Sequence, residues 1–201
     1  MPRLAWATDL HLNFLSEEDL SSFGDELARC EADALLVGGD TSEAYTLEHH
    51  LALVARRFGR PVWFVLGNHD FYRGSIAQVR RAADGLRSRL PQLRWLQSAG
   101  FVSLSAETAL VGCDGFGDAR SGNVDGSPVV LNDFLRIDEL TAIPYAQRLV
   151  RLNRLGDEVG EHLRSVLAPV LRAHKRVVVL THVPSFPEAC WYQGRFSDPV
   201  W

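Results

Sequence analysis

Short apolar runs alternate with longer stretches of mixed polarity along the first half of the chain. A run without polar positions predicts a strand that is covered on both faces, as in a parallel sheet. The stretches between the runs repeat apolar residues at helical spacing, and Leu47, Leu51 and Val54 form one such stripe. We therefore expect strands at residues 4–7, 34–37 and 62–66 and helices over residues 16–30, 46–58 and 75–90.

The second half of the chain changes character. Short strands are expected at residues 93–96, 101–104 and 108–112, the last two as a possible hairpin. The segment 113–128 is rich in Gly, Asp, Asn and Ser and is interpreted as loop. A mostly helical region over 132–171, interrupted at Pro144, leads to a β-branched strand at 176–180. Without repeats or a linker, residues 1–201 are interpreted as one α/β domain.

Composition narrows the class of protein. Hydrophobic residues make up 46% of the 201 positions, an ordinary fraction for a soluble globular protein. The sequence has no apolar run long enough for a membrane span and no signal peptide at residues 1–7, so a cytoplasmic location and no membrane partner are expected. The odd number of distant cysteines argues against a disulfide framework. These are Cys30, Cys113 and Cys190.

Polar clusters stand directly after four of the apolar strands. In an open α/β sheet the carboxyl ends of the strands form the crevice where ligands bind, so these side chains are expected to meet. Together they form a mixed nitrogen and oxygen set without thiolates, which suits Mn²⁺, Fe²⁺ or Zn²⁺. The clusters are Asp9 and His11, Asp40, Asn68 with His69 and Asp70, and His182.

The spacing within the clusters has physical reasons. In Asp9-x-His11 an extended chain would point both side chains to one side, toward one ion. Asp40 follows two glycines, where a tight backbone could bring its carboxylate close enough to bridge two cations. Taken singly, an aspartate could be a helix cap, Asn68 a turn residue and His182 a hydrogen-bonded histidine. Their shared position at one edge of the sheet favours the metal site.

The ordered set of motifs resembles the signature of the calcineurin-like metallophosphoesterase family. The motifs are Asp9-x-His11, Gly39-Asp40-x-x-Glu43, Gly67-Asn68-His69-Asp70 and His182. The resemblance implies a four-layer α/β/β/α sandwich and two divalent metal ions (Mn, Fe or Zn). It also implies hydrolysis of phosphate mono- or diesters by a hydroxide that bridges the two ions.

The resemblance also implies a role for each residue. Asp9 and His11 resemble ligands of the first metal, and Asp40 resembles the bridging carboxylate. Asn68 and His182 resemble ligands of the second metal, and Asn68 is also expected to help stabilise the phosphoryl oxygens. The remaining two motif residues resemble a catalytic pair, in which the aspartate holds the histidine, and the histidine protonates the leaving oxygen or stabilises the transition state. These are His69 and Asp70.

The sequence departs from the family pattern at two places. Glu43 stands where the family usually has a second aspartate. The family closes its site with a Gly-His-x-His motif, but no histidine follows His182 in this sequence. We therefore expect each metal to lack one ligand and the sheet to lack at least one strand, as in a truncated or naturally shortened protein. The aromatic segment 184–201 is expected to cover an open sheet face or to mediate self-association through that edge.

The substrate is less well defined by the sequence. Arg73, just past the Gly-Asn-His-Asp motif, is the better candidate for binding the phosphoryl group, and Arg120 the weaker one. The leading hypothesis is a phosphoesterase acting on small-molecule or phosphoprotein esters. A metal-binding interaction module with weak catalysis and a nuclease remain alternatives. A net charge of −4 disfavours the nuclease and makes nucleic acid an unexpected partner.

Overall fold

Four parallel strands form the first sheet, and each lies within a segment that the sequence predicts as a strand. The computed structural model describes residues 2–122, 124, 126, 129–192 and 194–196. The strands pair in the order β1-β2-β3-β4, so every neighbour in the sheet is also the next strand in the chain. Their bounds are β1 Leu4–Ala7, β2 Ala34–Val37, β3 Val62–Phe64 and β4 Leu93–Trp95.

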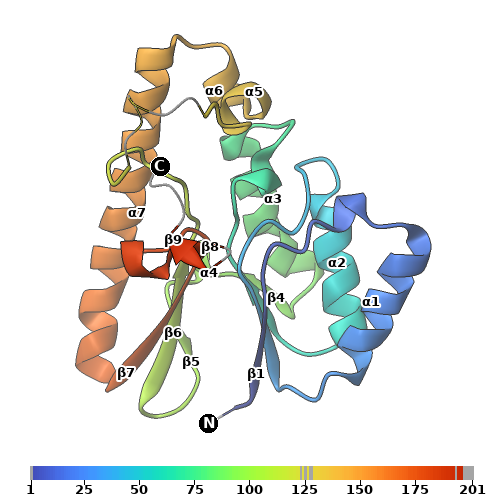
Figure 1. Cartoon of the computed structure of the whole chain (residues 1–201). Coiled ribbons are helices and arrows are strands. Elements are labelled where there is room, and N and C mark those ends of the chain that lie inside the picture. The colour runs from blue at the N-terminus through green and yellow to red at the C-terminus, as the bar shows by residue number, and fades with distance from the viewer. Residues whose placement is uncertain (1, 123, 125, 127–128, 193, 197–201) are drawn as a thin grey trace.

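Three helices connect these strands and lie together on one side of the sheet (Figure 1). They are α1 Glu17–Arg29, α2 Leu47–Phe58 and α3 Ile76–Arg89. The Ser16 hydroxyl accepts the backbone N–H of Asp19 at 3.1 Å, which caps the start of α1 as the sequence predicts. Two 3-10 turns follow β1 and β3, at Leu12–Phe14 and His69–Phe71, and they begin where the predicted site residues stand.

A second, smaller sheet faces the first. Its order is β5-β6-β7, with an antiparallel β5–β6 pair, which confirms the expected hairpin, and a parallel β6–β7 pair. Helix α7 lies on the outer side of this sheet, opposite α1 to α3 (Figure 1). The bounds are β5 Val102–Ser103, β6 Thr108–Cys113, β7 Arg176–Thr181 and α7 Tyr145–Ala173.

The core divides along these layers. Alternate residues of β2 point to opposite faces: Leu35 and Val37 belong to the cluster under the helices, and Leu36 to the cluster between the sheets. In that inner cluster Leu36 is joined by Leu110 of β6 and Leu180 of β7. Pairing of the two sheets therefore buries β2 on both faces, as its sequence predicts, whereas Trp6 of β1 is 67% exposed. The α/β class is confirmed.

Two predicted elements differ in detail. The strand expected over 93–96 ends at Trp95, because Leu96 begins the short helix α4 (Leu96–Ala99). The helical region expected over 132–171 is divided into α5 (Asp133–Arg136), α6 (Asp138–Thr141) and α7, and Pro144 is the residue before α7, as expected of an interruption there.

The C-terminal segment forms a small hairpin of its own, β8 (Trp191–Tyr192) with β9 (Arg195–Phe196), after the 3-10 turn Pro187–Ala189. Phe186 and Trp191 are 69% and 57% exposed, so these two side chains do not pack across a sheet face as the sequence suggested. Trp201 lies outside the described residues. In the part of the chain that is described, no helix has the length and apolarity that crossing a membrane requires.

A buried carboxylate joins the two sheets where they approach the predicted site. Asp114 follows β6 and is fully buried, and its Oδ1 accepts the backbone N–H of Leu66 at 2.9 Å and the indole N–H of Trp95 at 2.8 Å. The Nε of Arg80 lies 3.4 Å from its other oxygen, Oδ2. Because Leu66 directly precedes Gly67, Asp114 fixes the backbone that leads into the Gly-Asn-His-Asp motif.

We expect Asp114→Ala to lower the free energy of unfolding by about 3 kcal/mol, because it leaves two buried donors without a partner and removes one of the two carboxylates that Arg80 contacts. Asp114→Asn, which keeps one acceptor oxygen, should cost less. Urea denaturation followed by circular dichroism measures both. Asp84→Ala on the exposed face of α3 is the control, and it should change stability by no more than about 0.5 kcal/mol. A loss below about 1 kcal/mol for Asp114→Ala would contradict this role.

Candidate metal centre

The loops after β1 and β2 run side by side and hold their polar residues in an unusual backbone conformation. The N–H of Asp9 donates to the carbonyl of Gly39 at 3.1 Å, and the N–H of His11 donates to that of Asp40 at 3.0 Å. Asp9, His11 and Asp40 have φ of 53°, 44° and 52°, in the left-handed region that non-glycine residues seldom adopt. Such strain costs roughly 1–3 kcal/mol per residue and gathers at functional sites.

Two groups of potential metal ligands share Asp40. In the first, ligand atoms of Asp9, Asp40 and His182 all lie within 4.8 Å of one another. In the second, those of His11, Asp40 and His69 do so. Since metal–ligand bonds measure about 2–2.5 Å, atoms bound to one ion lie no more than about 4–5 Å apart, and both groups meet this limit.

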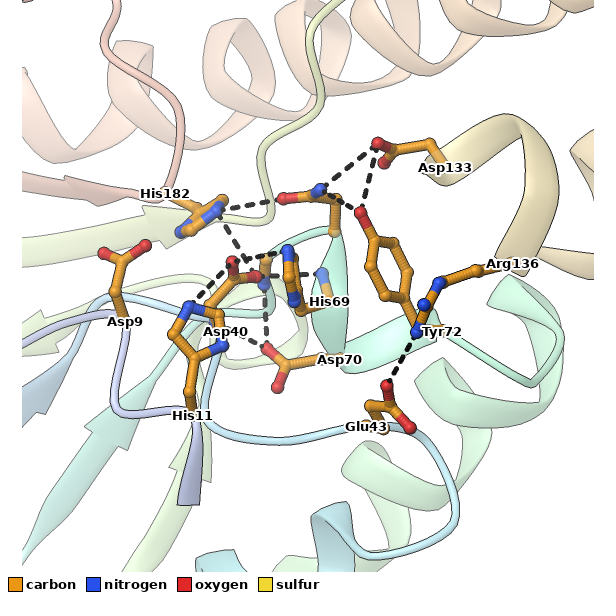
Figure 2. Close-up of polar contacts among 12 residues, drawn as sticks. Asp9, His11, Asp40, Glu43, His69, Asp70, Tyr72, Asp133, Arg136 and His182 are labelled. Atoms are coloured by element: carbon orange, nitrogen blue, oxygen red, sulfur yellow. Dashed lines mark hydrogen bonds and ion pairs between the residues drawn. The ribbon is translucent and has the colours of Figure 1, made fainter. Parts of the chain in front are cut away.

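This grouping differs from the sequence interpretation. An extended Asp9-x-His11 segment would send both side chains to one ion, but the left-handed backbone at both residues sends them to different groups. Asp9 faces His182, and His11 faces His69, with Asp40 between the two pairs (Figure 2). The structure thus brings the predicted ligands together but divides them in another way.

His182 is oriented as a metal ligand would be. Its Nδ1 lies 2.9 Å from the carbonyl oxygen of Gly38, which can only accept, so Nδ1 carries the hydrogen. The other nitrogen, Nε2, then presents its lone pair 3.4 Å from Oδ1 of Asp40 and 3.3 Å from Oδ1 of Asn68. A backbone carbonyl behind a ligating histidine is a common means of fixing its tautomer. The amide oxygen of Asn68 thus faces the same nitrogen, Nε2 of His182, as the carboxylate of Asp40 does.

His11 faces Asp40 with one ring nitrogen. Its Nε2 lies 3.9 Å from Oδ2 of Asp40, while its Nδ1, on another edge of the ring, is buried without a hydrogen-bond partner among the described residues. The nitrogen and carboxylate donor set around Asp40 contains no thiol, which fits a divalent transition-metal ion.

His69 borders the same space from the side of β3. Its Nε2 also lies 3.9 Å from Oδ2 of Asp40, and its ring stacks on that of Tyr72 with 4.2 Å between centroids. Burial lowers the pKa of His69, an effect that the carboxylate of Asp40 opposes and the nearby His11 reinforces. The sequence interpretation kept His69 apart from the ligands, whereas the structure places it within the second group.

Asp70 does something other than the sequence suggested. Its carboxylate accepts the backbone N–H groups of Asp40 at 2.9 Å, Ser42 at 3.0 Å and Gly67 at 2.9 Å. Both of its oxygens are thus engaged with backbone, so it holds the loops after β2 and β3 together instead of holding the ring of His69. Burial, and then the charge of Asp40, raise the pKa of Asp70 to about 8, although the backbone hydrogen bonds lower it.

A second layer of polar groups, which the sequence did not reveal, holds Asn68. Its amide Nδ2 donates to the Tyr72 hydroxyl at 3.1 Å and to Oδ2 of Asp133 at 3.3 Å, and Tyr72 also bonds Asp133. Burial raises the pKa of Asp133. Because the amide nitrogen is used here, the amide oxygen is free to turn toward His182. Tyr72 could have been noticed beside the motif, but Asp133 is 65 residues from Asn68.

The predicted substrate-binding arginines lie in different places. Arg73 is near the centre, where its Nε lies 3.2 Å from Oε2 of the buried Glu43. Arg136, which the sequence analysis overlooked, approaches the other oxygen of Glu43 at 3.3 Å (Figure 2). Arg120 instead pairs with Asp157 of α7 at 2.8 Å. Arg120 is therefore engaged elsewhere, and Arg73 stays a candidate.

Two glycines allow the loops to approach so closely. A Cβ on Gly67 would lie 2.2 Å from Oδ1 of Asp40 and 2.7 Å from Nε2 of His182. Gly39, with φ of 95°, would place a Cβ 2.7 Å from the backbone nitrogen of Gly67. No side chain fits at either position without separating the ligand-bearing loops.

The chain is similar to a known protein family and to a known fold. A model of the family described as calcineurin-like phosphoesterase matches residues 2–198. A search of curated proteins finds no match to this chain. The fold is similar to the crystal structure of phosphopantetheinyl hydrolase (PptH) from Mycobacterium tuberculosis, with a TM-score of 0.66 and 16% identity over 98% of this chain and 73% of that one. At that identity the likeness shows the shared fold alone.

We predict that Gly67→Ala abolishes tight binding of Mn²⁺, because the added methyl group displaces Asp40 and His182 together. Isothermal titration calorimetry measures the binding. The control is Gly85→Ala in the middle of α3, where a Cβ meets no atom within 4 Å. That variant should bind Mn²⁺ like the wild type and be more stable by about 0.5–1 kcal/mol, since alanine favours a helix over glycine. Unchanged Mn²⁺ affinity in Gly67→Ala would show that the ions bind elsewhere.

Proposed function

The chain belongs to the calcineurin-like phosphoesterase family, a family of metal-dependent hydrolases, and we propose that it hydrolyses phosphate mono- or diesters at the centre around Asp40. The observation that carries the proposal is the double use of one carboxylate. Asp40 belongs to two groups of nitrogen and oxygen atoms, each of a size that one ion can fill. A shared carboxylate between two such groups is what a binuclear hydrolytic centre requires.

Two divalent ions (Mn²⁺, Fe²⁺ or Zn²⁺) are the proposed cofactors. Asp9 and His182 would hold one ion and His11 the other, with Asp40 between the two groups. His69 would lie beside the second ion without binding it, so that its ring can carry a proton. Asn68, whose amide oxygen faces His182, would add a neutral ligand to the first. When bound, such ions lower the pKa of water so that hydroxide is available near neutral pH, and they offset charge on phosphoryl oxygens.

The chain's own residues would orient the ester and donate one proton to the leaving oxygen. A water oxygen forms a bond to phosphorus, the bond to the leaving oxygen breaks, and that oxygen gains a proton. His69 is the proposed donor, because its ring lies at the centre and is held in place by stacking on Tyr72. Asp70 acts indirectly by fixing the loops that carry His69 and Asp40. Asn68 and Arg73 are proposed to contact the phosphoryl oxygens.

The substrates proposed from the family are small-molecule or phosphoprotein phosphate esters. Self-association through an open sheet edge stays a prediction. The described β7 stands at the end of its sheet order, which is consistent with such an edge.

We predict that Asp40→Asn reduces hydrolysis of 4-nitrophenyl phosphate and bis(4-nitrophenyl) phosphate by at least about a thousandfold, since it weakens the hold on both ions at once. Release of 4-nitrophenol with saturating Mn²⁺ measures the rate. Asp84→Asn on the exposed face of α3 removes the same charge elsewhere, and it should leave the rate unchanged.

Near-normal activity of Asp40→Asn would exclude the shared-carboxylate centre. Tight binding of Mn²⁺ by a wild-type chain that hydrolyses neither ester would instead favour the alternative of a metal-binding interaction module. The first outcome tests the metal site around Asp40, and the second tests whether that site catalyses hydrolysis.

A further inference from the structure

Two arginines next to His69 share one buried carboxylate. The Nε of Arg73 lies 3.2 Å from Oε2 of Glu43, and the Nη1 of Arg136 lies 3.3 Å from Oε1. The Glu43 side chain is only 3% exposed, whereas those of Arg73 and Arg136 are 59% and 40% exposed. One carboxylate neutralises only one guanidinium, so this arginine pair, Arg73 and Arg136, keeps a net positive charge that faces solvent.

The arginine pair lies at one end of the metal centre. The Arg136 guanidinium is 5.7 Å from the centre of the Tyr72 ring, and the ring of Tyr72 stacks on that of His69. Figure 2 shows Arg136 and Glu43 beyond Tyr72, on the side of His69 away from Asp9 and His182. If His69 protonates the leaving oxygen, the pair lies where the leaving group departs.

The backbone fixes the pair in place. The N–H of Arg73 donates to the carbonyl of Arg136 at 2.6 Å, and Gly74 forms an isolated β-bridge with Ile137. Arg73 has φ of 62°, one more left-handed non-glycine residue among those at the site. Its guanidinium lies 5.9 Å from the ring centre of Tyr45, which is 65% exposed. Two segments distant in sequence thus converge to hold two guanidinium groups side by side.

Neutralising Glu43 does not explain this arrangement. A single arginine would balance the buried carboxylate, and ion pairs with largely exposed arginines contribute little to stability. Among the described contacts each guanidinium uses one nitrogen on Glu43, while a guanidinium carries five N–H donors in a planar fork. Such a fork matches a phosphate or carboxylate group, and Glu43 orients both forks from behind.

We propose that the arginine pair is a specificity site for an anionic group on the leaving-group side of the substrate. The preferred substrates are then phosphate esters whose alcohol part carries a second phosphate or a carboxylate. Glu43 is a positioning residue that aims the pair. The inference rests on the proposed hydrolase function and adds the substrate class to it.

The test compares esters that differ only at the far end of the alcohol. Butyl phosphate, 1,4-butanediol bisphosphate and 4-phosphooxybutanoate are hydrolysed with Mn²⁺ present, and released phosphate is measured; homologues of two to six carbons cover the span. We expect the anionic esters to have a KM about tenfold below that of the neutral one, as charge-assisted hydrogen bonds would give. The comparison of the bisphosphate with the carboxylate identifies which anion is preferred.

The variants separate recognition from chemistry. Arg136→Gln should raise KM for the preferred anionic esters about tenfold, with KM for butyl phosphate unchanged, because it removes a fork that only the anionic group uses. Arg73→Gln should raise KM for both esters, and more for the anionic ones, because Arg73 is also proposed to contact the phosphoryl oxygens. Arg136→Lys should restore part of the loss. Arg81→Gln, an exposed arginine of α3, is the matched control and should change neither KM. Thermal melting of each variant verifies folding.

Equal KM values of the wild type for neutral and anionic esters across all chain lengths would overturn the proposal and leave the hydrolase function standing. An equal rise of both KM values in Arg136→Gln would also overturn it. If the wild type hydrolyses no ester, the hydrolase function itself fails. The anion-binding role of the arginine pair is then tested by isothermal titration calorimetry, which compares the affinity of the chain for butane-1,4-bisphosphonate with its affinity for butylphosphonate. Equal affinities would refute that role.

Discussion

The centre depends on the placement of one carboxylate, that of Asp40 at the end of β2. Its Oδ1 accepts the backbone N–H of His69 at 2.9 Å and lies 3.4 Å from Nε2 of His182. Its backbone carbonyl accepts the N–H of His11, and its backbone N–H donates to Asp70. Asp40 thus joins the loops after β1, β2, β3 and β7, and each of these loops supplies a potential metal ligand. Displacing it would separate all of them.

The close approach of the loops around Asp40 depends on their backbone conformation. Asp9, His11 and Asp40 adopt left-handed φ, which costs free energy that the hydrogen bonds between the loops offset. Gly67 leaves room for the carboxylate of Asp40 and the ring of His182. Behind these loops, Asp70 and Asp114 use buried carboxylates to bind backbone N–H groups in the loops after β2 and β3. The rigid parts of the site are therefore polar contacts to backbone, supported by two hydrophobic clusters.

The sequence predicted the elements and the identity of the clustered residues because both depend on local pattern. Apolar runs located β1 to β3, and the polar residues after them had to meet at one sheet edge. The division of ligands between Asp9 and His11 could not be predicted, since a left-handed φ at a non-glycine residue is imposed by neighbouring loops. Asp133 and Arg136 were missed for another reason. They reach the site through contacts of α5 with residues 68–73 after β3, which no local pattern encodes.

The central claim is that two ions share Asp40, and electron paramagnetic resonance of the chain loaded with two equivalents of Mn²⁺ tests it most directly. Two Mn²⁺ ions joined by one carboxylate are close enough for magnetic exchange, so the account predicts the spectrum of a spin-coupled pair. The signal of isolated Mn²⁺ ions at full loading, in a chain that binds both equivalents tightly, would contradict the shared-carboxylate centre.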